Sequence, residues 1–145
     1  MLAKDLNKTK LGNARYFIIQ TFHFDASHSL RIEDFQYMSK HDLADLRKCF
    51  YDHGHTYQLD VEWEGSPTDE KPMIWPFGHL KEFTKTLIDS CDHQNLNKYF
   101  TWPTTLENLA NWFFKRLQIY NGDNLKIHSV TLREGLNNRV KVEAI

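Results

Sequence analysis

Apolar residues recur along this chain with two periods, one typical of strands and the other of helices. Residues 55–64, HTYQLDVEWE, alternate strictly between apolar and polar, which predicts a strand with one buried and one wet face. Residues 16–24, YFIIQTFHF, are β-branched and aromatic and predict another strand. Residues 125–134 and 139–145 predict two final strands joined by a Gly/Asn turn.

Two helices are expected between these pairs of strands. Apolar side chains are spaced at helical intervals across residues 77–91. A second helix is predicted to start near Thr104, because TTLE at 104–107 fits the capping-box pattern and an apolar stripe follows. A short helix is also expected at 41–49. The order β-β-α-α-β-β favours an α+β fold, with a four-stranded antiparallel sheet and both helices on its apolar face.

The composition is that of a single globular domain. The 145 residues are 41% hydrophobic and 26% charged, and we expect one domain over 1–145 with a flexible polar stretch at 1–14. A net charge of -1 provides no strong field toward nucleic acid or an anionic membrane. No signal peptide or bilayer-spanning apolar run is evident, so a cytoplasmic location is expected, where both cysteines stay reduced.

The stretch CFYDHGHTY, at 49–57, gathers side chains that bind metals. Side chains two apart in a strand share a face, so His53 and His55 fall on the apolar face if the strand extends back through Gly54. His28 continues the apolar row of the first strand. Three neutral imidazoles from neighbouring strands suit zinc and leave a fourth position open. An H-x-H pattern alone is also compatible with ordinary hydrogen-bonded histidines.

The role of Cys49 distinguishes two hypotheses about the metal site. As a fourth ligand it would close a Cys-His₃ site, which is a structural arrangement. Without a bond to the metal it would stand beside a metal-bound substrate, where positive charge nearby can lower the pKa of a thiol. The spacing of the residues permits both arrangements.

Three further residues have both a structural and a functional interpretation, and a fourth has a structural one. Asp92 and His93 follow the first long helix, where they could cap it or pair on the surface; alternatively, Asp92 orients His93 for proton transfer. Glu134 continues an apolar row, which suits either the wet end of a strand or a bidentate acceptor for two ring N–H groups. The capping-box position of Glu107 explains that residue without a function.

Six segments, taken in order, resemble the 6-pyruvoyl-tetrahydropterin synthase / 6-carboxytetrahydropterin synthase family. They extend from Phe22 to Glu134 and are FHFDASHSL, CFYDHGHTY, FGHLK, CDHQNLN, TLENLANW and LREG. The resemblance implies the tunnelling fold (T-fold), whose β-β-α-α-β-β order agrees with the pattern above. It also implies a homohexamer of two stacked trimeric barrels with active sites between subunits. Barrel closure would remove the exposed edges of a small sheet.

The resemblance implies a metal and a set of residues that bind the substrate. The cofactor would be zinc, with three histidine ligands, His28, His53 and His55. The pterin ring would be anchored by Glu134, with Thr105 and Glu107 as helpers. These residues stand at matching positions of the quoted motifs.

The resemblance also implies a catalytic group that moves protons. Cys49 would be the thiolate base and would not bind the metal. Asp92 and His93 would complete the group, reaching the site from a neighbouring subunit, with Asp92 orienting His93 as a proton shuttle. Zinc would hold the two side-chain hydroxyls of the substrate and lower the cost of negative charge on their oxygens.

The substrate implied is 7,8-dihydroneopterin triphosphate. The favoured product is 6-carboxy-5,6,7,8-tetrahydropterin, a precursor of 7-deazapurines such as queuosine, formed with release of acetaldehyde and triphosphate. We favour it because the C-x-x-x-H-G-H spacing resembles the bacterial enzymes. The alternative is 6-pyruvoyl-tetrahydropterin, as in the tetrahydrobiopterin pathway. Two competing classes are a non-catalytic pterin or purine binder with structural zinc, and a zinc-independent interaction domain.

Departures from the family pattern lie outside the core catalytic positions. Trp75-Pro76-Phe77 stands where many members have an aspartate before the phenylalanine. Asp52 precedes the HGH where a leucine is common, and by strand parity it points away from the two histidines. The step from His28 to Cys49 is long, so residues 29–48 are a candidate cover for the substrate.

Overall fold

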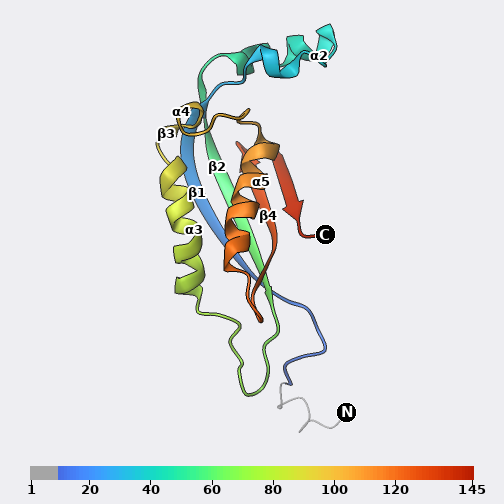
Figure 1. Cartoon of the computed structure of the whole chain (residues 1–145), viewed down its shortest axis with the longest axis vertical. Coiled ribbons are helices and arrows are strands. Elements are labelled where there is room, and N and C mark those ends of the chain that lie inside the picture. The colour runs from blue at the N-terminus through green and yellow to red at the C-terminus, as the bar shows by residue number, and fades with distance from the viewer. Residues whose placement is uncertain (1–9) are drawn as a thin grey trace.

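The computed structural model describes residues 10–145, which form one sheet with helices on one face (Figure 1). Five strands have the spatial order β3-β1-β2-β4-β5. Their bounds are β1 Tyr16–His28, β2 His53–Gly65, β3 Gln94–Asn95, β4 Lys126–Glu134 and β5 Asn138–Glu143. Most of the stretch expected to be flexible, residues 1–9, lies outside the described residues, and residues 10–14 form no helix or strand.

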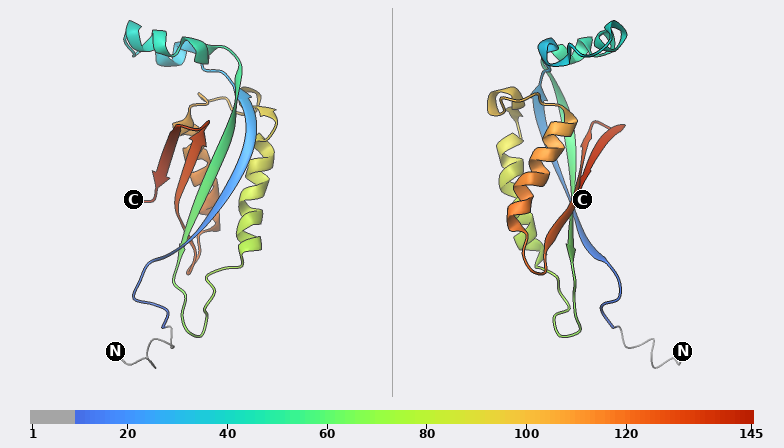
Figure 2. Two further views of the ribbon diagram at one scale, coloured as in Figure 1. Left: turned by 180° about the vertical axis from the view of Figure 1, so that it is seen from behind. Right: turned by 45° about the vertical axis from the view of Figure 1, so that its right-hand side comes forward.

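The two long helices cover the same face of the sheet (Figure 2). They are α3, Phe77–Cys91, and α5, Leu106–Leu117. The shorter helical pieces are η1 Ile32–Phe35, α2 Lys40–Asp45, η2 Arg47–Phe50, α4 Leu96–Tyr99 and η3 Gln118–Tyr120. This arrangement confirms the α+β T-fold predicted from the sequence. Within residues 10–145, no helix has both the length and the apolar character that crossing a membrane requires.

The sheet has one strand more than the four expected. Neighbouring strands are antiparallel except β3, which runs parallel to β1. After α3 ends at Cys91, His93 adopts a left-handed conformation with φ of 59°, and residues 94–95 then pair with residues 26–27 of β1. A two-residue strand is too short for alternation to reveal, because a period of two needs several residues.

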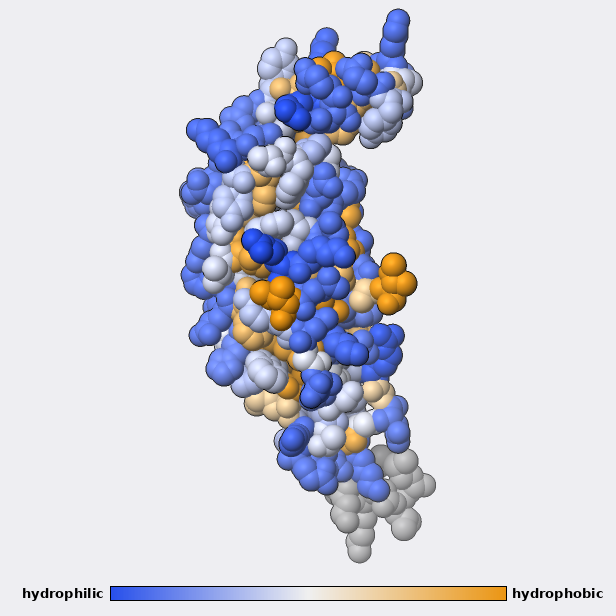
Figure 3. All heavy atoms as spheres, in the orientation of Figure 1, coloured by the Kyte–Doolittle hydropathy of each residue, from blue (hydrophilic) through white to orange (hydrophobic). Residues whose placement is uncertain are grey.

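The core lies between the helices and the apolar rows of the central strands. The residues of β2 that alternation predicts to be buried are indeed inaccessible to solvent, namely Tyr57, Leu59, Val61 and Trp63. They belong to one hydrophobic cluster with the apolar stripe of α5, which includes Leu109, Phe113 and Leu117. Burial of this apolar surface is the main favourable contribution to holding α5 on the sheet. The outer surface seen in Figure 3 is mostly hydrophilic, with a few separate hydrophobic side chains.

The chain between β1 and β2, residues 29–52, forms an arm that extends beyond the end of the sheet (Figure 1). A 2.8 Å hydrogen bond from Leu30 N to Cys49 O closes the base of the arm. Phe35 is buried and packs against Phe50 with ring centroids 6.5 Å apart. The helix expected at 41–49 is divided into α2 and η2. The closed base positions Cys49 at the ends of the two longest strands.

The helix α5 is capped one residue later than the capping-box pattern predicted. The prediction was therefore wrong about which threonine is the N-cap. The N-cap is Thr105, whose hydroxyl accepts a hydrogen bond from Asn108 N at 3.2 Å. Thr104 is fully buried instead. Because the helix begins at Leu106, Glu107 occupies its second position and cannot close a capping box. The side chain of Glu107 therefore lacks the structural explanation that the sequence suggested.

Candidate functional site

Pairing of β1 with β2 brings three histidines together at one end of the sheet. His28 lies directly opposite His53 in the register, and His55 lies opposite Ala26. The ring centroids are 4.6 Å apart for His28 and His53, 4.7 Å for His53 and His55, and 5.2 Å for His28 and His55. Each ring offers a nitrogen within 4.8 Å of the others. The three rings can therefore converge on a single ion.

Hydrogen bonds leave the Nε2 atoms of two rings available to a metal. His28 Nδ1 lies 2.9 Å from Thr104 O and 3.0 Å from Thr104 Oγ1, and His53 Nδ1 lies 2.7 Å from Tyr51 O. A carbonyl accepts only from a protonated nitrogen, so each Nδ1 donates and each Nε2 has a free lone pair. His28 Nε2 is buried with no hydrogen-bond partner. A neutral imidazole held by its other nitrogen is the usual form of a zinc ligand.

The environment of the cluster favours the neutral form of two rings, those of His28 and His55. Burial, followed by the charges of His53 and His55, lowers the pKa of His28 to about 4. Burial and the charge of His53 also lower the pKa of His55. Protons therefore compete weakly with a metal for these nitrogens near neutral pH. The donor set of three neutral imidazoles fits zinc and leaves a fourth coordination position open.

Cys49 lies beside the histidines but does not join them. It is absent from the group of three histidines whose ligand atoms lie within 4.8 Å of one another. It lines a cavity of about 770 Å³ together with His28, His53 and Glu134. Burial and the charge of Glu134 raise the pKa of this thiol. A metal ion nearby would have the opposite effect and lower the pKa. The protein's own residues therefore keep the thiol protonated, and only additional positive charge would favour the thiolate.

Glu134, Thr105 and Glu107 line the same cavity. Glu134 is the last residue of β4 and pairs with Tyr57 of β2. Its Oε1 lies 2.9 Å from His55 Nε2, without the alignment of a hydrogen bond. Burial raises the pKa of Glu134, an effect that the charge of His53 opposes. The carboxylate thus lies beside the histidine cluster and on the wall of the larger cavity.

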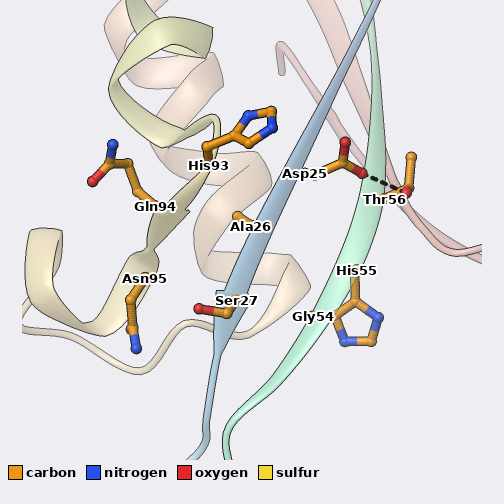
Figure 4. Close-up of a pocket in the computed structure, with 9 residues that line it drawn as sticks. All are labelled: Asp25, Ala26, Ser27, Gly54, His55, Thr56, His93, Gln94 and Asn95. Atoms are coloured by element: carbon orange, nitrogen blue, oxygen red, sulfur yellow. Dashed lines mark hydrogen bonds between the residues drawn. The ribbon is translucent and has the colours of Figure 1, made fainter.

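Asp92 and His93 lie elsewhere in the single chain. Asp92 is the C-cap of α3, and its Oδ1 lies 3.0 Å from His93 Nδ1. The hydrogen bond from Asp25 N lowers the pKa of Asp92, with a further contribution from His93. His93 lines a second cavity of about 510 Å³, which His55 also lines, but Figure 4 shows the His55 ring pointing away from His93, and the two rings belong to separate groups of possible ligands. One chain therefore does not bring the Asp92–His93 pair to the three histidines.

Two residues of the site escaped the sequence analysis. Thr104 holds His28 through both its carbonyl and its hydroxyl. The sequence signal was present as two consecutive threonines before a helix, but the pattern did not reveal which one caps the helix and which turns inward. Arg139 of β5 also lines the larger cavity. It sits in an exposed strand where nothing in the sequence distinguishes it from other surface cations.

The fold and the site define a small α+β domain of the T-fold type that carries a candidate metal centre. Comparison with known proteins places the chain more closely. Residues 17–144 match the family described as 6-pyruvoyl tetrahydropterin synthase. The chain belongs to this family and is an enzyme of the tetrahydropterin-synthase type.

Similar proteins carry more than one name. The dihydroneopterin monophosphate aldolase of Pyrococcus furiosus is 32% identical over 126 residues, covering 87% of this chain and 96% of that protein. The 6-carboxy-5,6,7,8-tetrahydropterin synthase of Haemophilus influenzae is 33% identical over 142 residues, covering 81% and 91%. The structure of 6-pyruvoyl tetrahydropterin synthase from Caenorhabditis elegans superposes with a TM-score of 0.76 at 23% identity, covering 95% of this chain and all of that one. The last comparison supports the fold.

Proposed function

We propose that this protein is a zinc-dependent lyase that converts 7,8-dihydroneopterin triphosphate and water to 6-carboxy-5,6,7,8-tetrahydropterin, acetaldehyde and triphosphate. The observation that carries the proposal is the convergence of three imidazoles, two of which, His28 and His53, line one cavity with Cys49 and Glu134. The synthase from Haemophilus influenzae, which aligns over most of both chains, supports this choice of product.

The candidate residues of the site have distinct proposed roles. His28, His53 and His55 hold zinc, which when bound supplies positive charge that polarises the side-chain hydroxyls of the substrate. Glu134 accepts two N–H donors of the pterin ring. Thr105 and Glu107 lie on the same wall and assist in binding the ring.

Proton transfer is assigned to Cys49, Asp92 and His93. Cys49 removes a carbon-bound proton as a thiolate, and it lies off the group of histidines as this role requires. The Asp92–His93 pair moves protons at a neighbouring subunit's site, which accounts for its distance from the histidines of its own chain. This assignment requires an oligomer, for which we propose the homohexamer typical of the fold.

A second candidate function is favoured by the Pyrococcus furiosus relative, named as an aldolase acting on dihydroneopterin monophosphate. An aldolase would break a carbon–carbon bond of the side chain and release an aldehyde that retains the phosphate. Among the described residues that line the larger cavity, Arg139 is the only lysine or arginine. One cation suits a single phosphate better than three. The 6-pyruvoyl product is a further alternative, supported by a relative of that name in Drosophila melanogaster, 31% identical over 110 residues.

A single assay distinguishes these outcomes. The zinc-loaded protein is incubated with dihydroneopterin triphosphate and, separately, with the monophosphate, and the products are identified by mass spectrometry. Acetaldehyde with free triphosphate is the expected result. Release of triphosphate without acetaldehyde would indicate the 6-pyruvoyl product, and a phosphorylated aldehyde from the monophosphate would indicate the aldolase.

A non-catalytic pterin binder with structural zinc is tested with Cys49→Ala. The lyase proposal expects this variant to retain one zinc per chain and its thermal stability while losing turnover by about a hundredfold or more. Loss of zinc together with stability would instead indicate that Cys49 is a structural ligand. Zinc content is measured by elemental analysis, and stability by calorimetry.

A further inference from the structure

Two hydrogen bonds connect the end of α3 to one residue of β1. The backbone N–H of His93 donates to Asp25 O at 2.6 Å, and the backbone N–H of Asp25 donates to Asp92 Oδ1 at 3.0 Å. His93 has a left-handed backbone with φ of 59°, which is unfavourable for a residue with a side chain. Such a conformation persists only where its surroundings hold it. Asp25 supplies part of that restraint.

The side chain of Asp25 is itself held in place. In the pairing of β1 with β2, Asp25 lies opposite Thr56, and Thr56 Oγ1 donates to Asp25 Oδ1 at 2.5 Å. The carboxylates of Asp25 and Asp92 and the imidazole of His93 all place an atom within 4.8 Å of one another. Figure 4 shows the His93 ring and the Asp25 carboxylate beside the same part of β1, with the bond to Thr56 drawn.

A surface aspartate in a strand would ordinarily need no explanation beyond solvation, but two features argue against that interpretation here. Aspartate is disfavoured within strands, and Asp25 lies well inside β1. Two carboxylates so close together repel each other unless a hydrogen-bond donor or a cation lies beside them. Of the three side chains in this cluster, the His93 imidazole is the one that can donate a hydrogen bond to a carboxylate.

We infer that Asp25, fixed by Thr56, is a positioning residue that holds the His93 imidazole in its working orientation. Asp92 holds the ring through Nδ1. Asp25 restrains it from the strand side, so that the ring can present Nε2 for proton exchange. The inference rests on the proposed role of His93 in proton transfer. It adds β1 and β2 to the elements that determine the geometry of the catalytic pair.

The test uses Asp25→Asn in the zinc-loaded protein, because asparagine keeps the shape and the backbone hydrogen bonds but removes the charge. We expect kcat to fall by about tenfold to a hundredfold while KM changes less than about twofold, since orientation and not binding is lost. Thr56→Val, which frees the Asp25 carboxylate, should lower kcat in the same way. Thr56→Ser, which keeps the hydroxyl, should restore it.

The chain provides a matched control on the same two strands. Thr21 Oγ1 donates to Asp60 Oδ1 at 2.7 Å across β1 and β2, far along the strands from His93. Asp60→Asn therefore removes the charge from an equivalent cross-strand pair and should leave kcat unchanged. An equal loss of kcat in Asp25→Asn and Asp60→Asn would overturn the inference, because it would indicate a general effect on the sheet.

A second readout does not depend on turnover. The ring-nitrogen chemical shifts of His93, assigned by comparison with His93→Gln, report whether Nδ1 alone carries the proton. We expect Asp25→Asn to move these shifts toward the averaged values of a free imidazole, and Asp60→Asn to leave them in place. Unchanged shifts in Asp25→Asn would overturn the inference. If the protein acts on neither pterin, the proposed function fails, and the chemical shifts still decide whether Asp25 positions His93.

Discussion

Among the individual residues, Thr104 and Tyr51 determine which histidine nitrogen is free. Their backbone carbonyls face the Nδ1 atoms of His28 and His53. Each ring must therefore be neutral to expose a lone pair at Nε2. The same burial that leaves His28 Nε2 without a hydrogen-bond partner makes its protonation unfavourable. The burial of His28 thus has two consequences: it leaves Nε2 available to a metal, and it makes the folded protein sensitive to acid.

The stability of the metal-free protein should fall on acidification because of His28. The unfolded chain takes up this proton near pH 6.5, whereas the folded protein does so only near pH 4. Unfolding is therefore favoured progressively as the pH falls between these values, by about 3 kcal/mol in all. Urea denaturation of chelator-treated protein between pH 7 and about pH 4 measures this effect. His28→Gln should flatten the profile, while exposed His41→Gln should not; equal profiles for both variants would contradict the prediction.

The hydroxyl of Thr104 should contribute to metal affinity. Thr104→Val preserves shape and the carbonyl contact but removes Oγ1, which lies 3.0 Å from His28 Nδ1. We expect zinc affinity, measured by chelator competition, to fall by about tenfold. Thr84→Val is the matched control, because Thr84 is also fully buried but its hydroxyl has no hydrogen-bond partner. Unchanged affinity in Thr104→Val would indicate that the carbonyl alone orients the ring.

At the scale of elements, close packing at the far end of β2 limits which residues the strand can accept. Gly65 ends β2, and a Cβ there would lie 2.2 Å from Ile74 Cγ2 and 2.7 Å from Asn124 O. The Ile74 side chain can move, but the Asn124 backbone oxygen cannot without displacing its loop. The loops before α3 and before β4 therefore meet at this glycine.

Gly65→Ala should consequently destabilise the fold by about 2 kcal/mol, the usual cost of overpacking. Gly78→Ala is the control, because a Cβ at Gly78 in α3 would have nothing within 4 Å. That variant should be neutral or slightly stabilising, since alanine is the better helix former. Chemical denaturation compares the two variants. A wild-type free energy of unfolding in Gly65→Ala would mean that the loops move aside freely.

For the whole molecule, the important feature is that the candidate catalytic groups lie in two places. Cys49 shares the larger cavity with His28 and His53, and His93 lines the smaller cavity. In the described part of the chain, β3 and β5 form the two edges of the sheet. We expect the proposed oligomer to associate through such edges and to bring the His93 of one chain near the histidine cluster of another.

Shared sites would allow two inactive variants to restore each other. Cys49→Ala and His93→Ala are each expected to lose turnover, but assemblies formed by co-expression should regain roughly a quarter of wild-type activity, since random mixing leaves that fraction of sites intact. Light scattering should report a mass well above that of one chain. Absence of recovery in verified mixed assemblies would mean that each chain completes its own site.

Features were predicted correctly from the sequence where the underlying pattern extended over many residues. The alternation of β2 predicted the buried row from Tyr57 to Trp63 correctly, because a period of two over ten residues has one consistent interpretation. The frame of the α5 cap was wrong, because Thr104 and Thr105 are chemically equivalent candidates. Only packing of Thr104 against His28 distinguishes them. The β3 pairing was missed because it involves two residues and a contact between segments far apart in the sequence.

The sequence by itself determined the fold class, the order of the main elements and the face on which the histidines lie, because those properties depend on local periodicity and on strand parity. Only the tertiary structure decided that His28 is held by Thr104, that Asp25 contacts the Asp92–His93 pair, and that this pair forms a group separate from the three histidines. Such contacts join segments separated by many residues. They depend on how strands and helices meet in space, which no local pattern encodes.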